Sequence, residues 1–205
     1  MDRREFLSTL GLALAGLAVP GVALAEAECS PFNRWGVRSC TAGLPSWRAG
    51  SIAATQQNSQ WCWAACVQMV LKHYRFEISQ KDIVRQVFGA EVNAPADVQT
   101  MISALNRVYT NAAGEHFTLV SGMANLNVAA SDLVLGQPLI VGTLRHAMVL
   151  SAISYDQDVH GRFVVTSAVV RDPWPTSGGR RNLSAKEWAS IDFLAFVRSP
   201  TQIIW

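Results

Sequence analysis

The stretch from Cys62 to Tyr74 most restricts how this chain can fold, because its apolar residues recur at helical spacing on more than one face. The polar residues Gln68, Lys72 and Arg75 share the one narrow face that remains. A helix that is apolar over most of its circumference has to be surrounded by other elements. We therefore expect a central helix, with two apolar stripes formed by Cys62, Ala65, Cys66, Met69 and Val70 and by Trp63, Val67, Leu71 and Tyr74.

Two further helices are predicted after the central one. Ser79 has the side chain of an N-cap for a helix over residues 80–88, and Gly89 is suited to end it. Pro95 fits the first turn of a third helix that extends through Tyr109. The residues of the third helix expected to face inward are Val98, Met101, Ile102 and Leu105.

The second half of the chain is rich in Val and Ile and predicts short strands. Polar turn residues at 156–161 indicate that two of these strands form an antiparallel hairpin. Helices followed by antiparallel strands predict an α+β fold, whereas residues 26–55 show no clear period and are expected to be irregular. The expected strands are 117–120, 139–143, 147–154, 163–171 and 193–197, with short helices at 129–135 and 184–190.

Residues 1–25 have the features of an export signal. Arg3 and Arg4 precede a weakly hydrophobic run, and Ala23 and Ala25 fit the small-residue pattern of a cleavage site. The paired arginines are typical of twin-arginine export, although a single membrane anchor is the alternative. We expect residues 26–205 to form one domain, periplasmic or secreted, without stable membrane association after cleavage.

Charge and cysteine content narrow the choice of function. Seventeen Lys and Arg residues against 15 Asp and Glu residues give no electrostatic reason to expect nucleic-acid binding. Export permits disulfides, and we expect Cys29 and Cys40 to pair, with a lipid on Cys29 as the rival use. In the chain-entropy model such a crosslink stabilises by about 2–3 kcal/mol.

Cys62 is the candidate nucleophile because it stands at the start of the predicted central helix. The positive end of a helix dipole favours a thiolate there, and the preceding turn, residues 56–60, carries three glutamines that could bind an oxyanion. The alternative is a buried, unreactive cysteine, which is the interpretation we favour for Cys66 one turn later. A metal pair would need further ligands at suitable spacing, and none is present.

His146 and Asp172 are the candidate partners of Cys62. His146 opens an apolar strand, where its imidazole could act as base and acid. Asp172 ends a later strand, just before Pro173, and could accept the imidazole N–H. Taken singly, the histidine could be structural and the Asp-Pro an ordinary turn. The other histidines, His73, His116 and His160, lack comparable surroundings.

As a set, these residues resemble papain-like cysteine peptidases, closest to the compact bacterial branch that includes plant-pathogen avirulence proteases. The Trp63-Ala64-Ala65 run after the cysteine and the Gly136-Gln137-Pro138 segment before an apolar strand carry this resemblance. It implies a papain-like fold with the nucleophile helix packed on a C-terminal antiparallel sheet, and a protein or peptide substrate. No cofactor or metal is expected. The chain departs from papain in its shorter Cys-to-His spacing and in having Gln60-Trp61 before the cysteine.

The resemblance also implies a role for each site residue. Cys62 is the nucleophile, His146 its base and acid, and Asp172 the orienting residue in place of the commoner Asn. Gln56, six residues before the cysteine, takes the oxyanion role, with Gln57 and Gln60 as possible substitutes. The predicted reaction is hydrolysis of a peptide or isopeptide bond. The alternatives are a catalytically silent, secreted binding module of the same fold and a metal-binding or redox protein.

Overall fold

The computed structural model of the protein describes residues 27–177 and 179–200. Within them, nine strands form one sheet in which every pairing is antiparallel, and six helices lie against it, which confirms the α+β prediction. The predicted export signal lies outside the described residues. No helix in the described ranges is long and apolar enough to cross a membrane.

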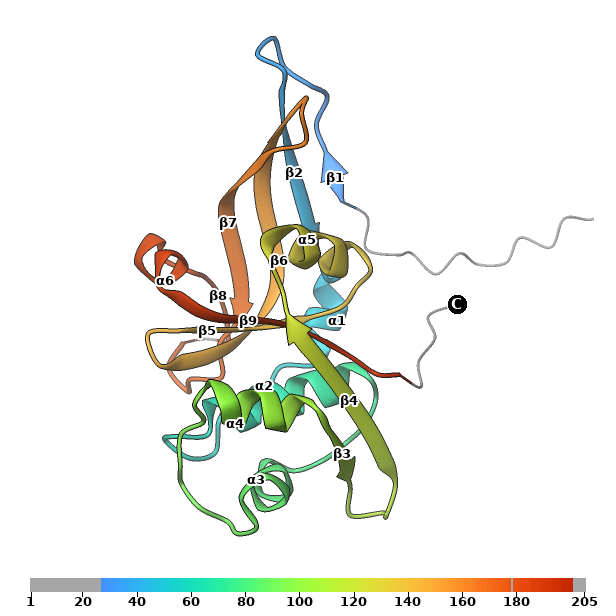
Figure 1. Cartoon of the computed structure of the whole chain (residues 1–205), viewed down its shortest axis with the longest axis vertical. Helices are drawn as coiled ribbons and strands as arrows, with labels where there is room; N and C mark the ends of the chain where they lie inside the picture. Colours follow the sequence, from blue (N-terminus) through green and yellow to red (C-terminus); the bar gives the residue numbers. More distant parts are fainter. Residues whose placement is uncertain (1–26, 178, 201–205) are drawn as a thin grey trace, which may run out of the picture.

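The sheet is built around β6, which pairs with three other strands (Figure 1). Its main order is β1-β2-β6-β5-β9-β4-β3, and β7 pairs with both β6 and β8. Strands β5 and β2 pair one after the other along one edge of β6, with residues 146–150 and 152–158, and β7 pairs with residues 149–157 along its other edge. The strands are β1 (Glu28–Cys29), β2 (Val37–Gly43), β3 (Arg107–Thr110), β4 (His116–Met123), β5 (Leu139–Thr143), β6 (His146–Asp158), β7 (Phe163–Arg171), β8 (Arg180–Asn182) and β9 (Ile191–Arg198).

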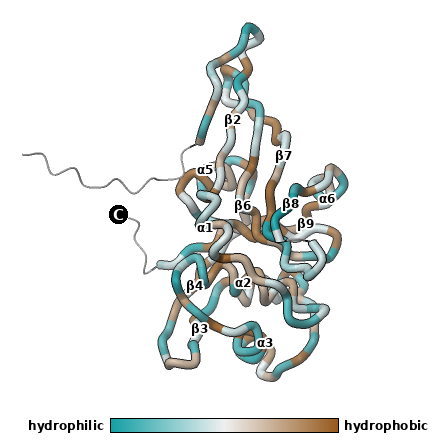
Figure 2. Tube along the Cα trace, turned by 180° about the vertical axis from the view of Figure 1, so that it is seen from behind, coloured by the Kyte–Doolittle hydropathy of each residue, from teal (hydrophilic) through white to brown (hydrophobic). Residues whose placement is uncertain are grey.

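Helices cover both faces of the central strands. Alternate residues of β5 and β6 face opposite ways: Ile140 and Val149 pack with α2, α3 and α4, whereas Leu139 and Leu150 pack with α5. Figure 2 shows hydrophobic residues along the central strands and hydrophilic ones on much of α3 and the outer turns. The helices are α1 (Ser46–Ser51), α2 (Cys62–His73), α3 (Gln80–Phe88), α4 (Val98–Leu105), α5 (Leu126–Val134) and α6 (Ala185–Ala189).

The central helix forms where the sequence predicts it. In α2, nine of the twelve residues are buried, so almost its whole circumference is covered. The predicted Ser79 cap is also confirmed, since its side chain accepts the Asp82 backbone N–H at 3.1 Å, and Gly89 ends α3 in the left-handed conformation. Both features are local, which is why the sequence alone reveals them.

Two predicted segments are wrong. Residues 26–55 are not wholly irregular, because they include β1, β2 and α1, and β2 pairs with β6 along its full length. The third helix does not run from Pro95 to Tyr109: it begins after the Asp97 cap and ends at Leu105, and the chain then forms β3 against β4. Val98, expected to face inward, is 39% exposed.

The predicted disulfide is present. Cys29 and Cys40 lie directly opposite each other in the β1–β2 pair and form a disulfide. It fixes β1 to β2, which is itself held along β6, so the crosslink secures the N-terminal edge of the sheet.

Candidate active site

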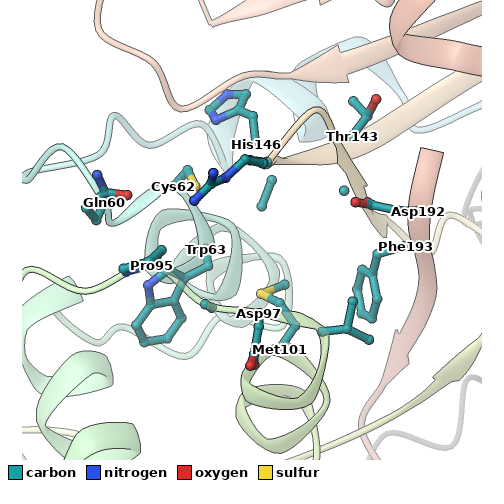
Figure 3. Close-up of a pocket in the computed structure, with 15 residues that line it drawn as sticks. Gln60, Cys62, Trp63, Pro95, Asp97, Met101, Thr143, His146, Asp192 and Phe193 are labelled. Atoms are coloured by element: carbon teal, nitrogen blue, oxygen red, sulfur yellow. The ribbon is translucent and has the colours of Figure 1, made fainter. Parts of the chain in front are cut away.

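Cys62 is the first residue of α2 and lines a pocket together with His146 (Figure 3). The N–H groups in the first turn of a helix have no intrahelical acceptor and carry the positive end of the helix dipole. Burial by itself would raise the pKa of the Cys62 thiol. Hydrogen bonds from His146 and from the backbone N–H groups of Ala147 and Trp63 nevertheless hold that pKa below its ordinary value of 9.0.

His146 is held at the start of β6 by a tight hairpin. Thr143 at the end of β5 pairs with His146, so only Leu144 and Arg145 form the turn. Both turn residues have positive φ, 50° for Leu144 and 64° for Arg145, as a two-residue hairpin of this hand requires. A conformation that non-glycine residues rarely adopt thus occurs beside the candidate catalytic histidine, which is where backbone strain tends to concentrate.

Asp172 lies beyond the end of β7 and orients the imidazole. Its Oδ1 accepts a hydrogen bond of 2.7 Å from His146 Nε2 and another of 2.9 Å from the Trp174 backbone N–H. Because Nε2 is engaged by Asp172, Nδ1 is the ring nitrogen available to Cys62. The structure therefore brings Cys62, His146 and Asp172 into one hydrogen-bonded chain, in the order that the sequence predicts.

The electrostatics of these three hydrogen-bonded side chains favour a thiolate–imidazolium pair. Burial by itself would lower the pKa of His146, but hydrogen bonds with Asp172 and Cys62 raise it to about 9. Burial likewise opposes ionisation of Asp172, yet hydrogen bonds from His146, the Trp174 N–H and Arg181 lower its pKa to about 2. A lowered thiol pKa beside a raised imidazole pKa shifts the shared proton from the thiol toward the histidine.

Arg181 and Glu187 extend this series of hydrogen-bonded side chains beyond Asp172, and neither residue was predicted from the sequence. Arg181 Nε donates to Asp172 Oδ2 at 2.7 Å, and the two terminal nitrogens of its guanidinium bind Glu187 at 2.6 and 3.0 Å. Glu187 in turn completes a capping box with Ser184 at the start of α6. The Ser-x-x-Glu pattern predicts that cap, but nothing in the sequence places Arg181 against Asp172.

Gln56 is buried close to the site, but its amide is occupied. Its backbone N–H donates to the Pro173 carbonyl at 2.8 Å, which ties the glutamine turn to the Asp172 loop. Its side-chain Nε2 donates to the carbonyls of Asn58 at 2.9 Å and Ser59 at 3.1 Å, whereas Oε1 is buried without a partner in the described chain. Gln60, by contrast, is exposed and lines the pocket with Cys62.

A buried amide network fixes the turn before Cys62. Gln80 of α3, only 1% exposed, accepts the Gln57 backbone N–H at 2.9 Å and donates to the Thr55 carbonyl and to Gln68 Oε1, each at 2.9 Å. Gln57 thus contributes its backbone to this network. Because α2 and α3 both hold the turn, its position relative to Cys62 is set by the helical core.

The pocket has a volume of about 340 Å³ and lies between the helices and the site where the end of β5 pairs with the start of β9. Figure 3 shows Cys62 and Gln60 on one side, Asp192 and Phe193 on the opposite side, and Asp97 and Met101 along the floor. Indole N–H groups secure the adjoining loop: Trp61 donates to the Val92 carbonyl at 2.8 Å and Trp63 to the Ala94 carbonyl at 3.1 Å. The thiol therefore opens onto a shaped cavity that a peptide side chain could occupy.

The remaining cysteine and histidines lie apart from this site. Cys66 is fully buried in the core, as predicted, and burial raises the pKa of its thiol. His73 is buried at the other end of α2, where burial lowers its pKa to about 4. Among residues 27–177 and 179–200, no group of three or more His, Cys, Asp or Glu side chains is arranged to hold a metal ion.

A thiol with a lowered pKa beside an imidazole with a raised pKa, itself oriented by a carboxylate, is suited to nucleophilic attack on a carbonyl carbon. The sequence matches the Peptidase_C39 like family over residues 51–196. Among solved structures, the chain resembles the peptidase domain of Streptococcus ComA, a bifunctional ABC transporter involved in a quorum-sensing pathway. That match has 19% identity and a TM-score of 0.48, and covers 73% of this chain and 98% of that one. A search of curated proteins gave no significant match.

Proposed function

The chain belongs to the Peptidase_C39 like family of cysteine peptidases, and we propose that it hydrolyses a peptide or isopeptide bond through Cys62, His146 and Asp172. The observation that carries this proposal is the continuous hydrogen-bonded chain from the thiol at the α2 start to the Asp172 carboxylate. The relation to the avirulence proteases stays a prediction of the sequence.

In the proposed reaction, the Cys62 thiolate attacks the carbonyl carbon and forms a tetrahedral intermediate. The protonated His146 then donates its proton to the leaving amine, and the C–N bond breaks to leave a thioester on Cys62. Water, deprotonated by the now neutral His146, attacks the thioester and releases the acid and the thiolate. Throughout, Asp172 holds the His146 ring and stabilises its charged form.

We propose that the oxyanion is bound by the Cys62 backbone N–H and the Gln56 amide. Both N–H bonds of Gln56 Nε2 now go to neutral carbonyls, and the one to Ser59 is the longer at 3.1 Å. A hydrogen bond to an oxyanion is about twice as strong as one to a neutral carbonyl, so the developing charge can draw one N–H away from Ser59. Gln60, which already lines the pocket, is the competing donor.

We also propose that the mature enzyme acts outside the cytoplasm. Support comes from the signal-like residues 1–25, with their paired arginines, and from the Cys29–Cys40 disulfide, which an oxidising compartment preserves. Comparing the N-terminal residue of the chain from the periplasmic or culture fraction with that of the cytoplasmic chain tests this point. Cleavage after Ala25 supports export, and an uncleaved cytoplasmic chain contradicts it.

Turnover of a fluorogenic peptide library tests the activity itself. We expect hydrolysis by the wild-type protein, none by the Cys62→Ala variant, and unchanged hydrolysis by Cys66→Ala if that variant keeps its fold by circular dichroism. Activity that survives in Cys62→Ala would refute the proposed nucleophile. Loss of activity in Cys66→Ala with an intact fold would shift the role to the buried thiol.

A further inference from the structure

The strand opposite the histidine hairpin contains one extra residue, Asp192. Gly142 of β5 pairs with Phe193 of β9, but the next β5 residue, Thr143, pairs with Ile191, so Asp192 is left over in a β-bulge. Bulges occur beside active sites, where they redirect a side chain. Here the bulge turns Asp192 into the pocket, on the side opposite Cys62 (Figure 3).

Gly142 leaves the space that the Asp192 carboxylate uses. A Cβ atom added at Gly142 would lie 3.2 Å from Asp192 Oδ1 and 3.0 Å from Phe193 Cβ. Both contacts are closer than ordinary van der Waals distance, so any side chain at 142 would press against the carboxylate. The small residue on β5 and the extra residue on β9 thus act together to present one acid to the cavity.

The Asp192 carboxylate has no hydrogen bond or ion pair within the described part of the chain, and it is exposed. The other acid of the pocket, Asp97, is engaged, because its Oδ1 caps α4 by accepting the Thr100 N–H at 2.7 Å. Arg145, from the hairpin tip, is the third charged residue of the lining apart from His146, and it forms no ion pair with either acid. Asp192 is therefore the carboxylate available to a ligand.

We propose that Asp192 is a specificity-determining residue that binds the cationic head of a Lys or Arg side chain of the substrate. This inference rests on the proposed peptidase function and names the substrate side chain of that same site. Val98, Met101 and Phe193 give the same pocket an apolar lining against which the methylene stem of a long basic side chain can pack.

Paired peptides test the proposal. In N-acetylated, C-amidated peptides, a single Lys is moved along a cleavable sequence and compared at each position with norleucine, which keeps the stem and removes the charge. At one position we expect kcat/KM to favour Lys by roughly 10-fold or more, the range of a charge-assisted hydrogen bond. The preference should weaken as salt is raised, because the pocket is open to solvent.

Two variants locate the effect. Asp192→Asn should abolish the Lys preference, because kcat/KM should fall for the Lys peptide far more than for the norleucine peptide. Asp97→Asn removes the same charge from the pocket but keeps a side chain that caps helices well, so the preference should persist. A preference that survives in Asp192→Asn, that disappears equally in Asp97→Asn, or that is absent from the wild-type protein overturns the proposal.

Binding separates this inference from the proposed activity. The same peptide pairs are titrated against Cys62→Ala protein, which keeps Asp192 and does not turn over. Tighter binding of the Lys peptide supports the inference even if no peptide is cleaved, an outcome that would contradict only the peptidase proposal. Cleavage without any Lys preference in binding or kcat/KM would contradict only the role of Asp192.

Discussion

Asp172 cannot be replaced by Asn while Arg181 is present, although Asn is the commoner orienting residue in papain-like enzymes. Both carboxylate oxygens have donors: Oδ1 receives N–H groups from His146 and Trp174, and Oδ2 receives Arg181 Nε–H. An Asn has only one acceptor oxygen. Whichever way its amide turns, an N–H group then faces either Arg181 or the His146 and Trp174 donors.

The cost of Asp172→Asn follows from those bonds. A hydrogen bond to a charged group contributes about 1.5–3 kcal/mol, and the variant loses the one to Arg181 or the two on the other side. Because the Asp172 side chain is 4% exposed, water compensates little. We expect a loss of about 1.5–3 kcal/mol in the free energy of unfolding. Activity should fall as well, since an amide N–H facing Nε2 would force the wrong His146 tautomer.

In an Arg181→Met background no guanidinium competes for the single amide oxygen that Asp172→Asn introduces. That oxygen can then accept from His146 and Trp174 alone. Asp172→Asn should then cost less in stability than it does in the wild type, and it should also reduce kcat/KM less. Urea unfolding and peptide hydrolysis of the wild type, the two single variants and the double variant measure the coupling between Asp172 and Arg181 in stability and in activity. Glu187→Gln is the matched control, because it disrupts the other side of Arg181 and should leave the cost of Asp172→Asn unchanged. Equal costs with and without Arg181 would refute the reasoning.

Three other predictions follow from the site and the sheet. The alkaline limb of the kcat/KM profile should lie near pH 9, where His146 loses its proton, and a limb near pH 6.5 would contradict the raised pKa. The stability that the raised His146 pKa contributes should be complete below pH 6.5 and should be lost as the pH rises through about 9. Gln56→Ala should lower kcat by about 10²–10³-fold and Gln60→Ala much less, and the reverse order would transfer the oxyanion role. Replacing both Cys29 and Cys40 by Ser should lower the free energy of unfolding by about 2–3 kcal/mol without changing kcat, and loss of activity in the folded variant would contradict a purely structural disulfide.

Features with strong local periodicity could be predicted from the sequence. The apolar circumference of α2, the Ser79 cap and the strand 139–143 depend on neighbouring residues, and each occurs where expected. The placement of Cys62 and His146 followed from these elements, because a helix start and a strand start determine where the two side chains begin.

Features decided by distant pairing could not be predicted. β2 is a stretch of mixed polar and apolar residues that becomes a strand because β6 pairs with all seven of them. Likewise, α4 stops at Leu105 because the residues from Arg107 onward pair with β4. The Arg181 contact with Asp172 depends on how β8 pairs with β7. The bulge at Asp192 is a mismatch in register between β5 and β9, and neither strand reveals it alone.

The rate at which Cys62 is alkylated, measured against pH in the wild-type and His146→Ala proteins with the adduct mapped by mass spectrometry, tests the central claim most directly. We predict labelling confined to Cys62, with an apparent thiol pKa below 9.0 in the wild type that rises in His146→Ala, since the imidazolium no longer stabilises the thiolate. A thiol pKa at or above 9.0 in the wild type, or one that does not change when His146 is removed, would contradict an activated Cys62–His146 pair.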